Sequence, residues 1–439
     1  MINKTNYIQK IIDREITTGV IGLGYVGLPL AVEMAKAGYK TVGFDISSSR
    51  VDMVNKGENY IGDVVDAELS DVIASKKLSA TDDYSHISEV DFIVICVPTP
   101  LDKYHQPDIS YVKNSCELIG KHMQKGSFVV LESTTYPGTT EELMLPILEQ
   151  NSGFKCGEDF YLGFSPERVD PGNPTYKTAN TSKVVGGVGK DATEIMGVFY
   201  RQVLEGEIVE VSSPMVAEME KILENTYRNI NIALANEMAI ICDKMGIDVW
   251  EVIDAAKTKP YGFSAFYPGP GVGGHCIPID PFYLTWKAKE YDYHTRLIET
   301  AAEINNSMPQ YVVDRTAALL NEQGISLKNS KILMLGVAYK QDIDDFRESP
   351  ALDVIKSLEK AYANVDFYDP HIPEYNFRGM NKTGIKKLTP EIIKQYDIVI
   401  ITTRHTTVDY ELVQKSAKII FDTKNAMQNI TPRNNITLL

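Results

Sequence analysis

A cysteine follows a glycine-rich stretch in PGPGVGGHCIPIDP, residues 268 to 281. Glycines allow a tightly folded loop and let a ligand approach backbone N–H groups closely. A thiol placed there, Cys276, is a candidate nucleophile, because loop amides and a nearby cation such as His275 or Lys221 would favour its thiolate. The alternative interpretation is a Gly/Pro turn that happens to contain a buried cysteine.

A second chemical signal is TTGVIGLGYVGLPLAVEMAKAGYKTVGFDIS, residues 17 to 47. The pattern predicts a strand, a G-x-G-x-x-G turn at Gly22, Gly24 and Gly27, a helix and a second strand that ends at Asp45. The glycines would admit a pyrophosphate to the helix N-terminus, and the aspartate would accept hydrogen bonds from ribose hydroxyls. This arrangement favours NAD over NADP, although Arg50 lies nearby in the sequence.

A bound NAD and an attacking thiol together indicate a four-electron oxidation. An alcohol gives up one hydride and becomes an aldehyde, which has no activated hydride until a nucleophile adds to its carbonyl. Addition of the Cys276 thiolate would permit a second hydride transfer, and hydrolysis of the resulting thioester would release a carboxylate.

The elements that must position these groups follow along the chain. Apolar runs at residues 91 to 100, 127 to 135, 160 to 168 and 183 to 188 have the spacing of strands in a doubly wound parallel sheet. Ligands of such sheets bind outside the carboxyl ends of the strands, where Thr99, Ser133, Thr134 and Glu167 lie, although each of these could be a turn or cap residue.

A long helix is predicted next, from Pro214 to just before Gly246. Its apolar stripe indicates core or a dimer face, and its opposite side presents a polar column of Lys221, Asn225 and Arg228, or else a solvated surface. A later helical stretch, residues 293 to 322, is predicted to be interrupted at Pro309.

The last region repeats the strand and helix alternation from Lys331 onward, without a second G-x-G-x-x-G. Lys340 and Arg347 follow its first strand, where they suit phosphate or uracil oxygens, or surface ion pairs. The predicted fold is α/β: two Rossmann-like parallel-sheet domains joined by a central helical domain with a long helix. The predicted domains are 1–205 for NAD, 206–322 for the helices and dimerisation, and 323–439 for the substrate.

Composition limits the class of protein. The chain has 439 residues and a formal net charge of -15 that is spread along it, which argues against a nucleic-acid partner. No apolar run approaches the length of a membrane span, and the charged N-terminus does not resemble a signal peptide, so we expect a cytoplasmic protein without a membrane partner. The five cysteines form no CxxC pair, and we expect no metal site.

Seven motifs in order carry a family resemblance: GLGYVGLP, VPTP, ESTTYPGTT, SPERVDPGNP, AEMEKILEN, PGPGVGGHCIPIDP and GVAYKQDIDDFRESP. The chain resembles the UDP-glucose/GDP-mannose dehydrogenase family over essentially its whole length. Within that family it is most similar to the bacterial UDP-N-acetylglucosamine 6-dehydrogenases that feed surface-polysaccharide synthesis.

The resemblance implies a role for each matched residue. The catalytic set would be Cys276, Lys221, Asn225, Asp280, Thr134 and Glu167. The cofactor set would be Gly22, Gly24, Tyr25, Val26, Gly27, Asp45, Arg50, Pro98, Thr99 and Thr134. The substrate set would be Glu167, Arg168, Lys221, Asn225, Arg228, Tyr267, Gly269, Gly273, Lys340 and Arg347. The resemblance also implies a homodimer through the central helices.

Departures from the family pattern bear on the sugar. UDP-glucose enzymes usually carry a lysine where this chain has Ile279 and a serine or tyrosine where it has His275, and their arginine before the glycine loop has no clear counterpart here. We therefore expect UDP-N-acetylglucosamine as the substrate, then UDP-N-acetylmannosamine, then UDP-glucose. A β-hydroxyacid dehydrogenase and a non-catalytic NAD-responsive binding protein are the alternatives outside the family.

Overall fold

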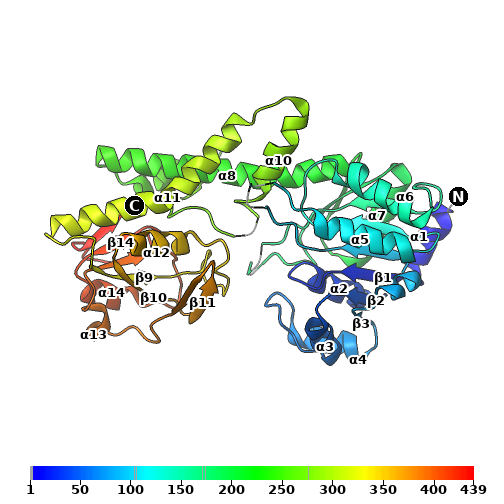
Figure 1. Ribbon diagram of the computed structural model, residues 1–439, viewed down its shortest axis with the longest axis horizontal. Helices are drawn as coiled ribbons and strands as arrows, with labels where there is room; N and C mark the ends of the chain where they lie inside the picture. Colours follow the sequence, from blue (N-terminus) through cyan, green and yellow to red (C-terminus); the bar gives the residue numbers. More distant parts are fainter. Residues whose placement is uncertain (1–2, 103, 105, 171, 174, 275) are drawn as a thin grey trace. The chain divides into compact units, whose positions relative to one another are not determined.

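The computed structural model describes residues 3–102, 104, 106–170, 172–173, 175–274 and 276–439 (Figure 1). The chain divides into two compact units. The first comprises Met1–Glu224 and Phe282–Tyr293, and the second comprises Asn225–Pro281 and His294–Leu439. Two helices, α8 (Pro214–Met245) and α10 (Asp280–Ala288), contribute residues to both units.

The described part of the first unit contains an eight-stranded sheet with the order β3-β2-β1-β4-β5-β6-β7-β8. Its strands are β1 Thr17–Ile21, β2 Lys40–Phe44, β3 Leu78–Thr81, β4 Phe92–Ile95, β5 Phe128–Leu131, β6 Tyr161–Phe164, β7 Lys183–Gly187 and β8 Ile208–Glu210. Neighbouring strands are parallel, as predicted for this sheet, except β6 and β7, which pair antiparallel. The described residues between β6 and β7 form no helix, whereas neighbouring parallel strands are usually connected by a crossover helix.

Both faces of this sheet are covered. Val20 and Val94 belong to one buried apolar cluster, whereas their neighbours Ile21 and Ile95 belong to another. Continuous apolar runs are typical of strands buried in this way. The helices of the unit are α1 Lys4–Ile12, α2 Gly27–Lys36, α3 Ser48–Lys56, α4 Asp66–Ala74, α5 Ser110–His122, α6 Leu145–Ser152 and α7 Lys190–Val203, with short 3₁₀ turns η1 Tyr84–Glu89 and η3 Lys289–Tyr291 and a π-helix η2 Thr139–Met144.

The second unit has a smaller parallel sheet, with the order β10-β9-β13-β14-β15 in the part of the chain that is described. The strands are β9 Lys331–Leu335, β10 Asn364–Tyr368, β13 Ile398–Ile401, β14 Ile420–Asp422 and β15 Ile436–Leu438, and the hairpin β11 Glu374–Phe377 and β12 Met380–Thr383 lies outside this sheet. The helices are α9 Val249–Ala256, α11 Arg296–Glu322, α12 Pro350–Lys360, α13 Pro390–Ile393 and α14 Tyr410–Ser416. The predicted fold class is therefore confirmed: two Rossmann-like sheets with a helical region and a long helix between them in the chain.

The ends of α8 agree with the sequence signals. The Ser213 hydroxyl accepts a hydrogen bond from the Val216 N–H (3.4 Å), and Gly246 ends the helix with φ of 71°. α11 differs from the prediction, because it continues through Pro309. That proline is buried, and packing of α11 offsets the hydrogen bond that its missing N–H removes.

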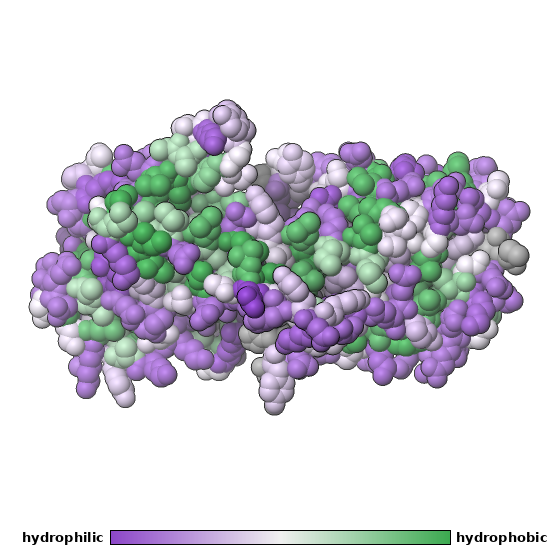
Figure 2. Space-filling model, turned by 90° about the horizontal axis from the view of Figure 1, so that it is seen from above, coloured by the Kyte–Doolittle hydropathy of each residue, from purple (hydrophilic) through white to green (hydrophobic). Residues whose placement is uncertain are grey.

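The apolar stripe of α8 is only partly core. Ile222 is fully buried, but Leu223, Leu234 and Met245 are 64%, 54% and 66% exposed. Figure 2 looks onto the face along which α8 runs and shows apolar side chains gathered there. In the described residues, no helix combines the length and the hydropathy that a membrane crossing requires.

Two glycines of the first turn differ in the space around them, which predicts different effects on stability. A Cβ at Gly27 would lie 1.8 Å from the Gly22 carbonyl oxygen, whereas a Cβ at Gly24 would meet no atom within 4 Å. We expect Gly27→Ala to lower the free energy of unfolding by about 1–3 kcal/mol, the usual cost of overpacking. Urea unfolding monitored by circular dichroism measures this change. Gly24→Ala is the control and should unfold near the wild-type midpoint; equal midpoints for the two variants would contradict the described turn.

Candidate functional site

The turn after β1 has the backbone of a dinucleotide site. Gly22 has φ of 92°, and a Cβ there would lie 2.6 Å from the Cys96 carbonyl oxygen. Asp45, 4% exposed at the end of β2, accepts hydrogen bonds from the Leu23 N–H (Oδ2, 2.9 Å) and the Ser47 N–H (Oδ1, 2.9 Å). The carboxylate therefore braces the turn and keeps lone pairs for a further donor.

These residues fit NAD. Space is open beside Gly24 at the start of α2, and Tyr25 in the same turn is half exposed. Val26, also predicted to bind the cofactor, is partly buried against the core. Nη1 of Arg50 lies 3.6 Å from Asp45 Oδ2, so the arginine neutralises part of the charge that a ribose would meet.

Two strand ends next to this turn are joined by side chains. The Thr99 hydroxyl donates to the Thr134 carbonyl (2.6 Å), and the Ser133 hydroxyl donates to the Val97 carbonyl (2.6 Å). Pro98 is exposed, and Thr99 is buried. The structure therefore brings Thr99 and Thr134, both predicted site residues, together at the carboxyl ends of β4 and β5.

Glu167 follows β6 beside a buried ion pair. Lys183 Nζ lies 3.0 Å from Glu132 Oε2 and 3.7 Å from Glu167 Oε2, and the Tyr200 hydroxyl donates to Glu132. Burial raises the pKa of Glu132 against the opposing effect of Lys183. Burial favours the neutral lysine, yet Glu132 and Glu167 hold the pKa of Lys183 above its usual value. The Lys183 ammonium is thus a fixed, buried cation next to Glu167.

Arg168, predicted to contact the sugar, already has carboxylate partners. It donates to Glu224 (Nη2 to Oε1, 2.5 Å) and lies 3.6 Å from Glu220. Burial and the neighbouring Glu224 carboxylate raise the pKa of Glu220 to about 7. An open pocket of about 260 Å³ lies beside this group and is lined by Arg168, Tyr176, Asn180, Thr181, Ser182 and Glu224.

Two of the three residues in the predicted polar column of α8, Lys221 and Asn225, are buried. Lys221 is 8% exposed and donates to the Glu167 carbonyl (2.5 Å). Asn225, one helical turn later and 6% exposed, donates to Asp280 Oδ2 (2.5 Å). Arg228 is exposed, whereas Asn229 is buried.

The loop of Cys276 lies in the second unit. Cys276 is exposed, and its carbonyl accepts hydrogen bonds from the N–H groups of Ile279 (3.0 Å) and Asp280 (2.8 Å). The Asp280 carboxyl is 3% exposed and faces Asn225. His275, named above as a candidate cation, lies outside the described residues. An exposed thiol and a buried carboxyl are thus held at the N-terminus of α10.

The glycines before the thiol have a packing role. A Cβ at Gly273 would lie 2.7 Å from Tyr339 Cβ, and one at Gly274 would lie 2.9 Å from the Tyr339 ring. A Cβ at Gly269 would lie 2.2 Å from Nζ of Lys424. Tyr267, half exposed, stacks on Trp250 with ring centroids 5.8 Å apart. Close contact with the second sheet domain therefore requires several of these glycines.

The loop after β9 carries Lys340 and Arg347, and Lys340 is partly buried. The Arg347 guanidinium donates two hydrogen bonds to the Asp345 carboxylate (Nε to Oδ1, 2.9 Å; Nη2 to Oδ2, 2.7 Å). This contact is the ion-pair alternative that the sequence left open for Arg347.

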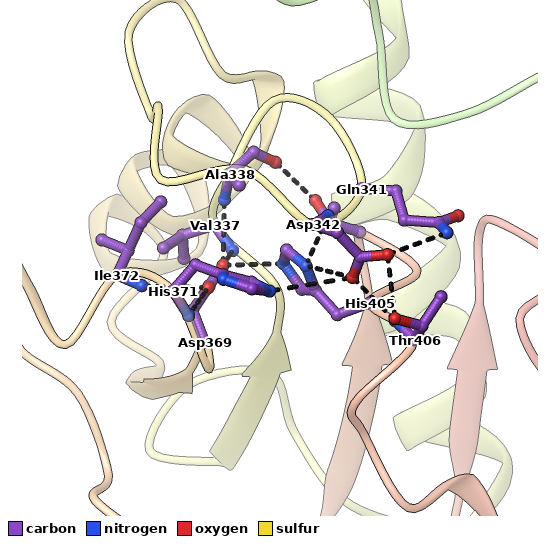
Figure 3. Close-up of polar contacts among 10 residues, drawn as sticks. Val337, Ala338, Gln341, Asp342, Asp369, His371, Ile372, His405 and Thr406 are labelled. Atoms are coloured by element: carbon purple, nitrogen blue, oxygen red, sulfur yellow. Dashed lines mark hydrogen bonds and ion pairs between the residues drawn. The ribbon is translucent and has the colours of Figure 1, made fainter. Parts of the chain in front are cut away.

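Figure 3 shows how that loop is anchored. Asp369 accepts hydrogen bonds from the N–H groups of Val337 (2.7 Å) and Ala338 (3.0 Å), and its Oδ2 lies 3.0 Å from Nε2 of His405. Asp342, His371 and His405 lie close enough together to be considered as metal ligands. However, Nδ1 of His405 accepts a hydrogen bond from the Asp342 N–H (3.0 Å), so this nitrogen has no lone pair left for a metal ion. We therefore describe these residues and Asp369 as a hydrogen-bonded brace for the loop that carries Lys340.

Lys424 was missed by the sequence reasoning. It follows β14, and its Nζ would lie 2.2 Å from a Cβ at Gly269, so its ammonium faces the glycine loop. Burial lowers the pKa of Lys424 to about 8. The sequence signal for Lys424 is a lysine after a predicted strand in IIFDTKN, which is the same signal as at Lys340.

Sequence comparison decides the family. Residues 16–204 match the NAD binding domain of the UDP-glucose/GDP-mannose dehydrogenase family, residues 215–307 match its central domain, and residues 333–429 match its UDP binding domain. The chain belongs to this family. It is accordingly a nucleotide-sugar dehydrogenase that uses NAD, as the glycine turn and Asp45 predicted.

Relatives in the family act on more than one sugar. The chain is 36% identical to a UDP-N-acetyl-D-glucosamine 6-dehydrogenase of Pseudomonas aeruginosa, over 94% of this chain and 97% of that protein. It is also 36% identical to a UDP-N-acetyl-D-mannosamine dehydrogenase of Pyrococcus horikoshii, over 93% and 95%. A solved UDP-D-ManNAc dehydrogenase from Pyrococcus horikoshii superposes with a TM-score of 0.88 at 35% identity, covering 96% of this chain and 98% of that one.

The position of Lys424 predicts a pH-dependent affinity for UDP. Its pKa of about 8 means that the ammonium is charged near neutrality and becomes neutral as the pH rises through that value. Because the diphosphate is an anion, UDP should bind more weakly at about pH 9.5 than at about pH 7. Isothermal titration with UDP measures both affinities.

Two substitutions control this experiment. Lys424→Met should weaken UDP binding at about pH 7, and Lys424→Arg should keep the affinity and remove its decline at high pH, since a guanidinium stays charged. Unchanged UDP affinity in Lys424→Met would exclude the lysine from the site.

Proposed function

We propose that this enzyme oxidises carbon 6 of UDP-N-acetylglucosamine to the uronate, with two NAD consumed for each sugar. The observation that supports the proposal is the exposed Cys276 thiol on a loop whose Asp280 is buried and hydrogen-bonded to Asn225. The product would be a precursor for surface polysaccharide. Its two co-substrates, NAD and a nucleotide sugar, favour a cytoplasmic location.

The first step would take the alcohol to the aldehyde. Bound NAD supplies the hydride acceptor in this step and in the second oxidation. The hydroxyl proton would leave through a water molecule positioned by Asp280, Lys221 and Thr134. Thr99 and Thr134, joined by their hydrogen bond at the sheet edge, would lie on the nicotinamide side.

The second step would use the thiol. The Cys276 sulfur adds to the aldehyde carbon, forming a C–S bond and a thiohemiacetal whose oxygen is stabilised by Lys221 and Asn225. Loss of the second hydride leaves a thioester on Cys276. The lysine ammonium and the amide each have a fixed partner in the structure, the Glu167 carbonyl and Asp280, which preorganises them for this role.

Hydrolysis would complete the reaction. A water molecule adds to the thioester carbonyl, the C–S bond breaks, and the thiol is regenerated with the carboxylate as product. Asp280 and Glu167 are the proposed proton acceptors for this water. The buried Lys183 ammonium lies 3.7 Å from Glu167 Oε2 and would help to hold that carboxyl in position.

The other assignments follow the same proposal. NAD would be held by Gly22, Gly24, Gly27 and Asp45, and the UDP portion by Tyr267, Gly269, Gly273, Lys340 and Arg347 together with Lys424. Arg168 and Arg228 remain our proposed contacts to the sugar. We divide the chain functionally at 1–205, 206–322 and 323–439.

UDP-N-acetylmannosamine is the nearest alternative substrate, since relatives that carry this name are as similar to the chain as the N-acetylglucosamine enzyme is. UDP-glucose is the next. Selection between the two N-acetyl sugars depends on the orientation of one substituent, and a few contacts decide it.

Substitution of the nucleophile gives a direct test. Cys276→Ala should bind NAD and the UDP-sugar like the wild type and form no uronate, because the groups proposed to bind both ligands lie elsewhere. The assay follows uronate by mass spectrometry with UDP-N-acetylglucosamine, UDP-N-acetylmannosamine and UDP-glucose in parallel. Uronate formation by Cys276→Ala would refute the thiol mechanism, and faster oxidation of another sugar by the wild type would replace the proposed substrate.

We also propose a homodimer formed through the exposed apolar stripe of α8. Leu234→Glu should convert the dimer to a monomer, because a charge would be buried in the interface. Light scattering coupled to size-exclusion chromatography measures the mass. Tyr362→Glu, at a residue 71% exposed outside α8, should leave the dimer intact. A dimeric Leu234→Glu would show that another surface mediates assembly.

A further inference from the structure

Three buried asparagines of the second unit lie behind the cysteine loop. Asn229 and Asn236 come from α8, and Asn305 comes from α11. They are 3%, 0% and 3% exposed. A buried side-chain amide destabilises a protein unless its hydrogen bonds are made, so the partners of these three amides show what they do.

The amides form one directed chain of hydrogen bonds. The Gly269 N–H donates to Asn236 Oδ1 (2.9 Å), and Asn236 Nδ2 donates to Asn305 Oδ1 (2.9 Å). Asn305 Nδ2 donates to the carbonyl of Asn229 (3.1 Å) and approaches its Oδ1 (3.4 Å). Asn229 Nδ2 donates to the Ile277 carbonyl (3.1 Å).

Both ends of this series of hydrogen bonds are therefore on the cysteine loop. Gly269 begins the glycine-rich part of the loop, and Ile277 follows Cys276 directly. Between the two ends lie Gly271 and Gly274, with φ of 133° and 91°. Ordering such a glycine-rich segment costs more conformational entropy than ordering other residues. Hydrogen bonds that run in one direction also strengthen one another. The series of amide hydrogen bonds is therefore suited to hold the cysteine loop in one conformation.

We propose that Asn229, Asn236 and Asn305 are positioning residues that hold the cysteine loop in the conformation required for attack by Cys276. Their side chains bond to the loop backbone and to one another, and we assign them no contact with substrate. The inference rests on the proposed function of Cys276 and adds to it the groups that fix its loop. It also gives a role to Asn229 and Asn236, two buried polar residues of α8 that follow Asn225.

Hydrogen exchange in the full-length protein measures the loop directly. Asn305→Ala removes the central link, and backbone amides of the peptide spanning 268–280 should then exchange at least about tenfold faster, while amides of β9 should be unchanged. Asn231→Ala is the matched control, since Asn231 bonds to the Tyr227 carbonyl of its own helix (2.7 Å). Unchanged loop exchange in Asn305→Ala would overturn the proposal.

Kinetics supply the second readout. With the sugar that the wild type oxidises best, Asn305→Ala should lower kcat by about tenfold or more, the usual consequence of a misplaced reacting group, and leave the KM for NAD within about twofold. A faster-exchanging loop with unchanged kcat would also overturn the proposal. If Asn305→Ala does not fold, Asn229→Ala breaks one end of the chain and is measured in the same way.

The failure of the two proposals can be told apart. If the wild type oxidises no UDP-sugar, the proposed function is wrong, and hydrogen exchange still decides whether the asparagines order the loop. If the wild type is active and the variants differ from it in neither exchange nor kcat, only the positioning role is wrong.

Discussion

Buried polar groups have to be paired, and in this protein the pairing holds the functional loops. Glu218 of α8, which is 1% exposed, accepts hydrogen bonds from the N–H groups of Gly138 (2.5 Å) and Thr140 (2.9 Å), just after Thr134. Asn225 of the same helix holds Asp280. Each group would be costly to bury alone, and each stabilises the fold only while the loop it binds is in place. α8 thus holds these loops by its buried polar side, and its exposed apolar side is the surface that we propose for the dimer.

The two Rossmann-like sheets use an aspartate at the same place and to different effect. Asp45 ends β2 and braces the turn after β1, and Asp369 follows β10 and braces the turn after β9. In addition to the turn, Asp369 bonds to His405 and to the N–H groups of His371 (2.9 Å) and Ile372 (3.1 Å). Its oxygens are therefore engaged within the protein, whereas the Asp45 oxygens keep capacity for a ribose. The glycine pattern predicted NAD in the first sheet alone, and this difference gives a physical reason.

The sequence predicted the parts whose signal is local. The glycine turn, both ends of α8 and the strands predicted in the runs 91–100, 127–135, 160–168 and 183–188 follow from local patterns. The column of Lys221 and Asn225 follows from helical periodicity. The antiparallel pairing of β6 with β7 could not be seen, because it depends on how a long loop returns. Continuation of α11 through Pro309 could not be seen either, because tertiary packing overrides the local preference.

The candidate site was predicted less completely than the fold. Lys424 and the three asparagines acquire meaning only when segments far apart in sequence meet, as Gly269 meets both Lys424 and Asn236. The sequence predicts a ligand-binding role for the glycines of the loop, and the structure adds that a Cβ at Gly273 or Gly274 would be too close to Tyr339. The sugar that the enzyme prefers could not be predicted from the sequence either, because it depends on contacts that no short motif encodes.

In the proposed mechanism, one thiol carries the substrate between two oxidations. The most direct measurement is the ratio of NADH formed to UDP-sugar consumed by the purified wild-type enzyme, taken at completion with NAD in excess and with a hydrazine present to trap free aldehyde. We expect a ratio of two with no trapped aldehyde. A ratio of one, with the aldehyde recovered as its hydrazone, would contradict the proposed mechanism.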